Sequence, residues 1–210
     1  RGCGGGTMDY SYPLRVSASR YPERTAVSFR GASVSYAAVD ERADVLAGAL
    51  VERGLTGRTV GTLLLNEPDT LVTYLGLARA GGVNVPVNVR LSSREQEYVL
   101  TDAGASCLVV DREYLAQVRE LRERLPEVRD VVVCGAGQDE LEDEVAFGTL
   151  LRGDRPDERD LPRCEDGSPA TITYTAGTTG FPKGVVRTHG ANLWNVANSA
   201  LGSPRSTDDV

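Results

Sequence analysis

The chain has 210 residues and a mass of 22.5 kDa, enough to bury a hydrophobic core without disulfides or a structural metal. Hydrophobic residues make up 40% of it and charged residues 25%, which is typical of a soluble globular protein and excludes collagen-like and disordered classes. The 30 acidic and 23 basic residues give a net charge of −7, so the whole chain repels nucleic acid and anionic membrane surfaces. A polyanionic substrate would therefore need a local site.

Cysteine and histidine are too few and too scattered to suggest a metal cluster. The four cysteines are Cys3, Cys107, Cys134 and Cys164. They form no CxxC pair, and His189 is the only histidine. No apolar run reaches the roughly 18 residues of a membrane span, and residues 1–7 lack the apolar stretch of a signal peptide. We therefore expect a cytoplasmic protein with reduced thiols, no metal-binding residues and no membrane span, in which residues 1–7 are an upstream extension or a cloning remnant.

From about residue 25, short β-branched runs alternate with amphipathic stretches. Residues 25–29 and 32–35 flank Arg30-Gly31 as the strands of a hairpin would. Ser35 can then cap a helix that ends near Gly54. The apolar residues on one face of that helix are Val39, Ala43, Leu46 and Leu50. This stretch predicts a hairpin followed by an amphipathic helix.

The alternation continues through the middle of the chain. Ser92 and Glu95 have the spacing of a capping box at the start of a helix. The predicted elements are a strand at 60–65, a helix from 68 to about 80, a strand at 83–87, a helix at 94–103, a strand at 106–110, a helix at 112–125 and a strand at 130–134. Consecutive strands joined by crossover helices predict an α/β fold with mostly parallel sheets and flanking helices.

The last third begins with a charged segment, residues 152–166, in which ten of fifteen residues are charged and two are proline. We expect a solvated surface connection there. A strand at 171–175, a turn rich in glycine and threonine, a strand-like run at 184–187 and a helix at 192–199 follow. Leu193 and Trp194 fit the packed face of that helix better than a platform for stacking bases.

Gly135-Ala136-Gly137 begins a GxGxxG pattern directly after the strand at 130–134. Glu140 stands where the third glycine belongs, and the acidic residues of 139–144 would repel a pyrophosphate. We therefore interpret this segment as a turn and not as a dinucleotide site.

Residues 175–184 (TAGTTGFPKG) combine three glycines, three threonines and one lysine. Glycines let backbone N–H groups converge on a phosphate, threonine hydroxyls add donors, and Lys183 supplies a mobile positive charge. The segment is not a Walker P-loop, because Pro182 and Gly184 stand where that motif needs a glycine and a hydroxyl. The composition predicts a site for the phosphates of a nucleotide, in preference to a glycine-rich turn without a ligand.

Residues 173–189 (TYTAGTTGFPKGVVRTH) resemble the phosphate loop, YTSGTTGxPKGV, of the adenylate-forming superfamily of acyl-CoA synthetases, luciferases and nonribosomal-peptide adenylation domains. Residues 75–91 (LGLARAGGVNVPVNVRL) are similar to that family's LxALxAGAVxVPLNPRL segment, and residues 35–50 resemble its early helix region. The resemblance covers essentially all of residues 10–210. It implies the N-terminal part of the acyl-CoA synthetase-like fold.

The resemblance also implies a reaction in two halves. A carboxylic acid attacks ATP to give an acyl-adenylate and pyrophosphate, and a thiol, usually that of coenzyme A, then takes the acyl group. The residues that it places on the β- and γ-phosphates are Thr175, Gly177, Thr178, Thr179, Gly180 and Lys183. Mg²⁺ would share the phosphate charge, and Lys183 is the expected catalytic residue. Ala176 departs from the family, because it replaces a serine or threonine and removes one hydroxyl donor.

Residues 84–91 (NVPVNVRL) look more like the PLNPRL of acyl-CoA synthetases than the PLDPxYP of peptide-synthetase domains. This favours coenzyme A as the acceptor, with a carrier protein as the alternative. His189 completes the family's TH dipeptide, and we expect it to be a helix-start residue satisfied by local backbone, without a catalytic role.

The family's later motifs, which bind adenine, ribose and Mg²⁺ and supply a C-terminal lysine, have no counterpart here. We therefore expect residues 8–210 to be the N-terminal part of the large AMP-binding domain, without the small C-terminal domain and inactive alone. Such a part would expose apolar surface near its C-terminal end and could form a homodimer. The alternative is a stand-alone nucleotide-binding or interaction module that has the loop without the chemistry.

Overall fold

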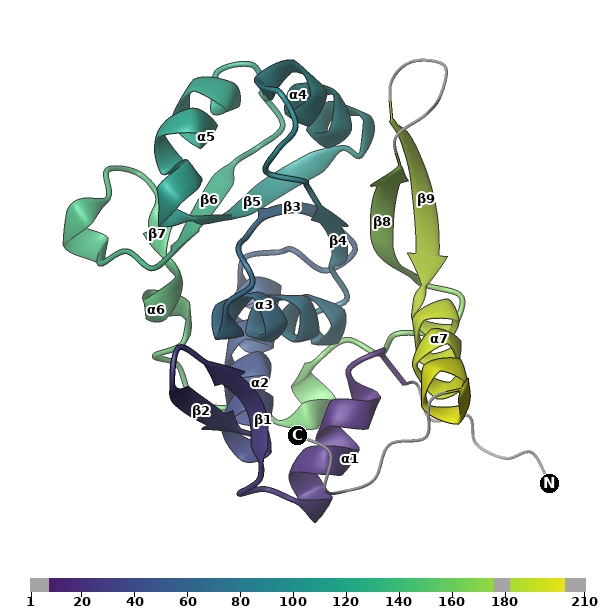
Figure 1. Cartoon of the computed structure of the whole chain (residues 1–210). Helices are drawn as coiled ribbons and strands as arrows, with labels where there is room; N and C mark the ends of the chain where they lie inside the picture. The colour runs from purple at the N-terminus through teal and green to yellow at the C-terminus, as the bar shows by residue number, and fades with distance from the viewer. Residues whose placement is uncertain (1–7, 176–181, 203–210) are drawn as a thin grey trace.

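A seven-stranded sheet with helices on both faces organises the part of the chain that the computed structural model describes, residues 8–175 and 182–202 (Figure 1). The helices are α1 (Tyr12–Arg20), α2 (Tyr36–Glu52), α3 (Pro68–Arg79), α4 (Ser93–Asp102), α5 (Leu115–Arg122), α6 (Phe147–Leu150) and α7 (His189–Gly202). The strands are β1 (Thr25–Phe29), β2 (Ala32–Ser35), β3 (Thr59–Leu63), β4 (Val83–Pro86), β5 (Ala105–Asp111), β6 (Asp130–Cys134), β7 (Val145–Ala146), β8 (Pro169–Thr175) and β9 (Lys183–Thr188). Short 3₁₀ turns occur at η1 (Arg112–Tyr114), η2 (Gln138–Glu140) and η3 (Glu158–Asp160).

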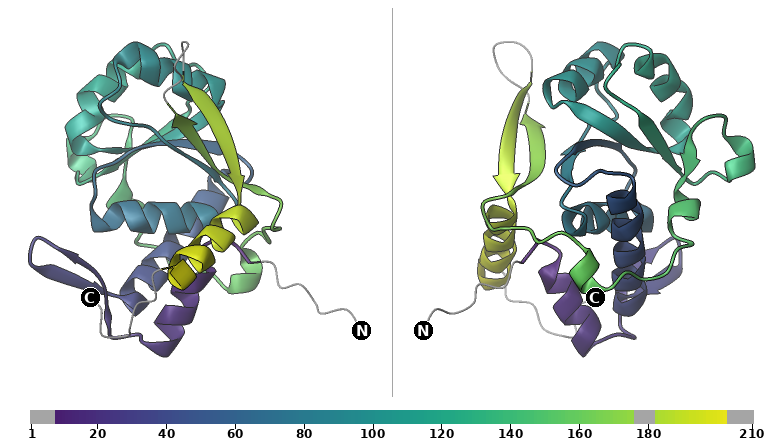
Figure 2. Two further views of the ribbon diagram at one scale, coloured as in Figure 1. Left: turned by 45° about the vertical axis from the view of Figure 1, so that its right-hand side comes forward. Right: turned by 180° about the vertical axis from the view of Figure 1, so that it is seen from behind.

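The strand order in the sheet is β7-β6-β5-β3-β4-β8-β9. Neighbouring strands are parallel throughout, except that β8 and β9 form an antiparallel hairpin at one edge. β1 and β2 form a separate antiparallel hairpin beside α2. Two further views show the β8–β9 hairpin and α7 standing together at one side of the molecule (Figure 2). The prediction of an α/β fold with a mostly parallel sheet and flanking helices is confirmed.

Two hydrophobic clusters cover the two faces of the sheet. Side chains in a strand point alternately to opposite faces, so Val109 of β5 joins one cluster while Leu108 and Val110 join the other. The first cluster includes Leu46 of α2 and the second includes Leu121 of α5. Each of these helices buries its apolar side chains against one face of the sheet. This packing fixes the helices in place relative to the strands.

Local capping signals place several helix starts correctly. Ser35 Oγ accepts a hydrogen bond from the backbone N–H of Ala38 at 3.2 Å, as expected for the N-cap of α2. The capping box of α4 is complete, because Ser92 Oγ accepts from Glu95 N and Glu95 Oε2 accepts from Ser92 N at 2.8 Å. The predicted turn after β6 is also present, with Gly135 in the left-handed region at φ +75°.

Some elements differ from the sequence-based expectation. The predicted helix at 112–125 consists of η1 followed by α5, which ends at Arg122. The structure adds α1, α6 and β7, none of which the sequence pattern indicated. α1 buries only Ala18, and α6 and β7 have four and two residues, so none of them shows a hydrophobic period.

The expectation of a solvated connection at residues 152–166 is wrong for part of that segment. Leu161 and Cys164 are buried, and Arg155 pairs with Asp40 and Asp44 of α2 at 2.7 and 2.6 Å. Charged residues in this segment therefore pack against α2, because buried carboxylates there need positive partners.

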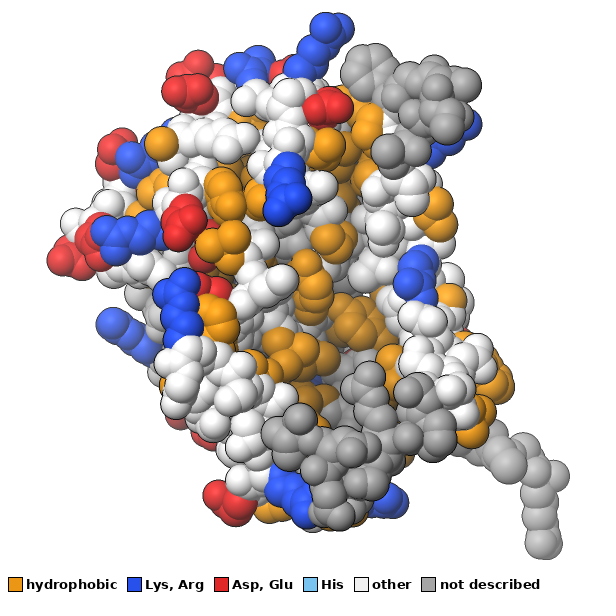
Figure 3. All heavy atoms as spheres, in the orientation of Figure 1, with side chains coloured by type: hydrophobic (Ala, Val, Ile, Leu, Met, Phe, Trp, Pro, Cys, Tyr) orange, Lys and Arg blue, Asp and Glu red, His pale blue; other side chains and the backbone are white. Residues whose placement is uncertain are grey.

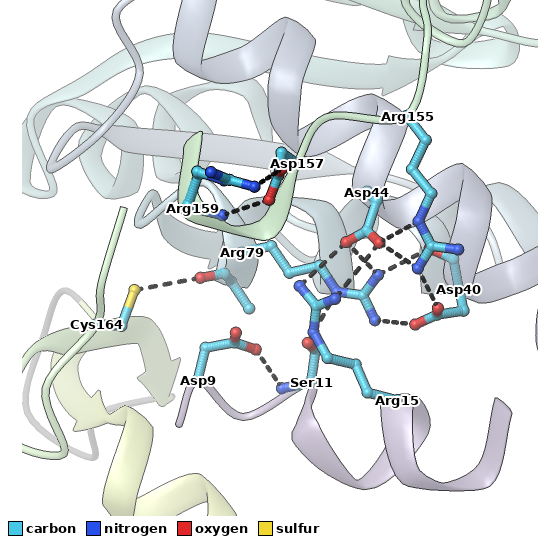
Figure 4. A network of polar contacts seen from close by, with 11 residues as sticks. Asp9, Ser11, Arg15, Asp40, Asp44, Arg79, Arg155, Asp157, Arg159 and Cys164 are labelled. Atoms are coloured by element: carbon cyan, nitrogen blue, oxygen red, sulfur yellow. Dashed lines mark hydrogen bonds and ion pairs between the residues drawn. The ribbon is translucent and has the colours of Figure 1, made fainter. Parts of the chain in front are cut away.

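Those carboxylates belong to a charge network between α1, α2 and α3 (Figure 4). Arg79, at the end of α3, is fully buried and contacts Asp40 Oδ1 at 2.7 Å and Asp44 Oδ1 at 2.8 Å. Its Nε donates to Ser11 Oγ, and Arg15 of α1 adds a further contact to Asp44 at 3.0 Å. Ion pairs and hydrogen bonds satisfy the buried charges and join three helices.

The packed position expected for Trp194 is not observed, because its side chain is 71% exposed. β9 is an edge strand and α7 packs beside the hairpin, so one face of this region is left open to solvent. Val185, Val186 and Leu201 are exposed there too, and hydrophobic side chains are visible along the hairpin and α7 in Figure 3. The expected apolar surface near the C-terminal end is therefore present. Within the described ranges, no helix has the length and hydropathy that crossing a membrane requires.

Candidate functional site

The β8–β9 hairpin carries two of the residues expected to bind phosphate. Thr175 is the last residue of β8, and Lys183, the first residue of β9, is its register partner. β8 is parallel to β4, so this end of the hairpin lies beyond the carboxyl end of a parallel strand. Ligands of open α/β sheets bind outside that edge. Gly177, Thr178, Thr179 and Gly180 lie outside the described residues.

Both described residues are available to a ligand. Thr175 and Lys183 are exposed, and Lys183 forms no ion pair with any residue in the described ranges. Lys183 is also the only lysine in the sequence, so the site holds the one primary amine of the chain besides its amino terminus. A hydroxyl and an ammonium group facing one space can together bind a phosphate oxygen.

Side-chain hydrogen bonds hold this hairpin against the rest of the molecule at two positions along β8. Next to Thr175, the Tyr174 hydroxyl donates to Asp102 Oδ2 at 2.6 Å. Further down, Asn192 of α7 donates through Nδ2 to Thr171 Oγ1 at 3.4 Å, and Thr171 is the register partner of Asn84 in β4. Sequence reasoning missed Tyr174 and Asp102 as a pair, because 72 residues separate them and no local signal joins them.

His189 begins α7 and is buried at the base of the hairpin. Its Nδ1 accepts from the backbone N–H of Tyr10 at 3.3 Å, and the two rings stack with centroids 5.6 Å apart. Burial lowers the pKa of His189, and its Nε2 has no partner among the described residues. The expected local backbone partner is therefore wrong for the ring, since Tyr10 is 179 residues away, although the His189 N–H does donate to nearby Ser168.

The residues that flank the loop do not make a magnesium site by themselves. Mg²⁺ is usually held by carboxylates together with substrate phosphates. Thr175, Pro182 and Lys183 offer a hydroxyl and an ammonium group but no carboxylate, and in the described ranges no cluster of three or more His, Cys, Asp or Glu side chains could hold a metal ion. Thr175, Pro182 and Lys183 therefore supply no carboxylate ligand for Mg²⁺.

A cavity in the described part of the chain lies away from the hairpin. It has a volume of about 510 Å³ and is lined by residues of α1, the end of α3 and the 157–164 segment. Arg79 and Arg159 on its wall are already paired with carboxylates. Neither Thr175 nor Lys183 lines it, so it is separate from the hairpin site.

The chain is similar in sequence to known CoA ligases. Indoleacetate–CoA ligase of Aromatoleum aromaticum is 34% identical over 204 residues, which are 96% of this chain and 39% of that protein. 4-Hydroxybutyrate–CoA ligase 2 of Metallosphaera sedula is 29% identical over 196 residues, 90% of this chain and 35% of its own length.

Among solved structures, the anthranilate CoA ligase AuaEII in complex with anthranoyl-AMP superposes with a TM-score of 0.84 at 25% identity, covering 94% of this chain and 37% of that one. The chain thus spans less than two fifths of the length of these relatives. Residues 14–210 match the family described as AMP-binding enzyme. The chain belongs to the AMP-binding enzyme family.

Proposed function

We propose that this chain supplies the ATP-phosphate site of an AMP-forming acid–thiol ligase. Such an enzyme activates a carboxylic acid as an acyl-adenylate and passes the acyl group to coenzyme A. The observation that carries the proposal is that Thr175 and Lys183 face each other at the carboxyl end of β8, both exposed. Family membership and the CoA ligases among the relatives support the same reaction.

In the first half-reaction, a carboxylate oxygen attacks the α-phosphorus of ATP, and the bond from that phosphorus to the oxygen bridging the β-phosphate breaks. Negative charge then builds on the leaving pyrophosphate. Lys183 places its positive charge beside that group, and Thr175 donates a hydroxyl hydrogen bond to it. Gly177, Thr178, Thr179 and Gly180 are proposed to add N–H and hydroxyl donors. Contacts that strengthen as charge develops lower the barrier.

In the second half-reaction, the thiol sulfur attacks the acyl carbonyl, the thiol loses its proton and AMP leaves. Coenzyme A is proposed as the acceptor in preference to a carrier protein, because residues 84–91 resemble the CoA-ligase pattern and both relatives compared above are CoA ligases. Groups for adenine, the acid and coenzyme A are not assigned to the described residues, so the chain alone is proposed to be inactive.

The single lysine makes the phosphate-site proposal directly testable. Reductive methylation with ¹³C-formaldehyde keeps the lysine charge and should give one dimethyl-lysine NMR signal, assigned by its absence in Lys183→Arg. Titration with inorganic pyrophosphate should move this signal, whereas the same concentration of chloride should not. A lysine signal that does not shift when pyrophosphate is added would contradict the proposal.

A further inference from the structure

The backbone alone fixes the β8–β9 hairpin only loosely to the sheet. Within the described ranges, β8 is in register with β4 at one position, Asn84 with Thr171. By contrast, β3 and β4 are in register from Thr59 with Val83 through to Thr62 with Pro86. Because a single register position does not define the direction of a strand, contacts nearer Thr175 must fix where the far end of the hairpin lies.

Tyr174 makes such a contact, one residue before Thr175. Its hydroxyl donates to Asp102 Oδ2 at 2.6 Å, and Asp102 is the last residue of α4. α4 itself is firmly seated, because Val99 and Leu100 are fully buried in the cluster against the sheet. The hydrogen bond therefore connects the phosphate end of the hairpin to a helix whose position the core determines.

The aromatic ring of Tyr174 is also held in place by its neighbours, in addition to the hydrogen bond of its hydroxyl. Its register partner in β9 is Gly184, and a Cβ added there would lie 2.9 Å from Tyr174 Cζ and 3.0 Å from Ile172 Cγ2. Tyr174 and Ile172 pack against the same cluster as α4. An aromatic ring that covers a glycine on the neighbouring strand pins the register of that pair. The glycine beside Lys183 thus makes room for the ring that reaches α4.

Burial and the hydrogen bond to Asp102 raise the pKa of Tyr174, so its hydroxyl remains a donor at every pH at which the protein would be assayed. Asp102 accepts with a carboxylate oxygen, and hydrogen bonds to charged acceptors are stronger than those between neutral groups. The contact therefore links β8 to the end of α4 at the surface of the molecule.

We propose that Tyr174 and Asp102 are positioning residues for phosphate binding: their hydrogen bond sets the place of Thr175 and Lys183 relative to the sheet, with Gly184 providing the space for the tyrosine ring. The inference rests on the proposed phosphate site. It adds a role for Tyr174 and Asp102, which are 72 positions apart in the sequence. Neither residue is proposed to contact the nucleotide itself.

The Lys183 NMR signal tests this with matched variants. Tyr174→Phe and Asp102→Ala remove the hydrogen bond, whereas Asp102→Asn keeps an acceptor oxygen. Tyr21→Phe is the control, since Tyr21 is exposed and distant in sequence from the hairpin. We expect the first two variants to raise the pyrophosphate concentration at half-shift by about 10-fold, and Asp102→Asn and Tyr21→Phe to stay within about 3-fold of the wild type. Thermal unfolding of all four should remain cooperative.

The double variant Tyr174→Phe with Asp102→Ala should bind no more weakly than either single variant, because both remove the same contact. If Tyr174→Phe titrates like Tyr21→Phe, the positioning role is refuted while the phosphate site stands. If Asp102→Asn binds pyrophosphate as weakly as Asp102→Ala does, the hydrogen bond does not position the site and the proposal is overturned. A wild-type signal that does not shift when pyrophosphate is added would contradict both this inference and the proposed function. Should Tyr174→Phe fail to fold, the comparison of Asp102→Asn with Asp102→Ala decides the question.

Discussion

Arg119 and Glu144 are joined by two parallel hydrogen bonds, from Nε to Oε1 at 2.7 Å and from Nη2 to Oε2 at 2.9 Å. This pair connects α5 to the residue just before β7, the edge strand opposite the β8–β9 hairpin. The hydrogen bonds from Arg119 lower the pKa of Glu144 from 4.5 to about 2. Because the carboxylate side chain is almost completely buried, its pairing contributes to the stability of this edge.

The pH dependence of stability follows from the direction of that shift. The folded pKa lies below the ordinary value, so the contribution is complete above about pH 4.5 and is lost as the pH falls toward 2. We expect Glu144→Gln to lower the free energy of unfolding at pH 7 and to flatten its decline between pH 4.5 and 3. Urea unfolding at several pH values measures this. Glu127→Gln, at an exposed position, is the control and should retain the wild-type profile.

Replacing Arg79 by methionine should destabilise the fold strongly. The substitution leaves Asp40 and Asp44 as buried carboxylates that have lost their central partner, which typically costs about 3–5 kcal/mol. Arg159→Met is the matched control, because Arg159 is exposed and its surface pair with Asp157 contributes little to stability. Chemical denaturation gives both values. Equal effects of the two substitutions would contradict the importance assigned to the buried network.

Gly184→Ala should impair the hairpin. The added methyl group would meet the Tyr174 ring at 2.9 Å, and relieving such a contact costs about 1–3 kcal/mol. The melting temperature should fall, and the Lys183 signal should need more pyrophosphate to shift. Gly167→Ala offers a fair comparison, because nothing lies within 4 Å of the added group. An unchanged melting temperature for Gly184→Ala would show that the ring has room to move away.

The exposed apolar face of the hairpin and α7 predicts self-association of the chain. Val186 is 55% exposed on an edge strand and Trp194 is 71% exposed on α7, so both can be covered when two copies meet. Sedimentation velocity should show dimers or larger species at tens of micromolar, a range set by modest interfaces (about −6 to −7 kcal/mol). The double change Val186→Lys with Trp194→Gln should shift the protein toward monomer, while Tyr21→Gln should not. A wild-type chain that stays monomeric throughout would refute this.

Much of the fold could be read from local patterns, because the signals involved act over a few residues. Ser35 and the Ser92–Glu95 pair mark helix starts through bonds that span three residues. Arg79, in contrast, lies in an otherwise apolar stretch, and its burial depends on carboxylates 35 and 39 residues away. No periodicity reveals such a partner. The packing of residues 152–166 against α2 likewise depends on partners that are distant in the sequence, since Arg155 pairs with Asp40 and Asp44.

The candidate site divides in the same way. Thr175 and Lys183 are expected to bind phosphate because the segment that resembles a phosphate loop concentrates its donors in ten consecutive residues. The structure places these two residues opposite each other in the hairpin, and their phosphate contacts stay a prediction. The contacts that hold the hairpin, from Tyr174 to Asp102 and from His189 to Tyr10, join segments 72 and 179 residues apart. Such pairs depend on the topology of the sheet, which a single sequence does not specify.

The stacking of Tyr10 on His189 has a consequence for how the protein folds on the ribosome. The chain emerges from its N-terminus, so Tyr10 is exposed long before its partner ring exists. At about 5–20 residues per second, synthesis from Tyr10 to His189, 179 positions later, takes on the order of 10–40 s. During that interval α1 must rely on its contacts with α2 and on the Arg79 network. The final closure of the base of the hairpin is therefore a late event, which comes after strands β3 to β7 of the sheet have been synthesised.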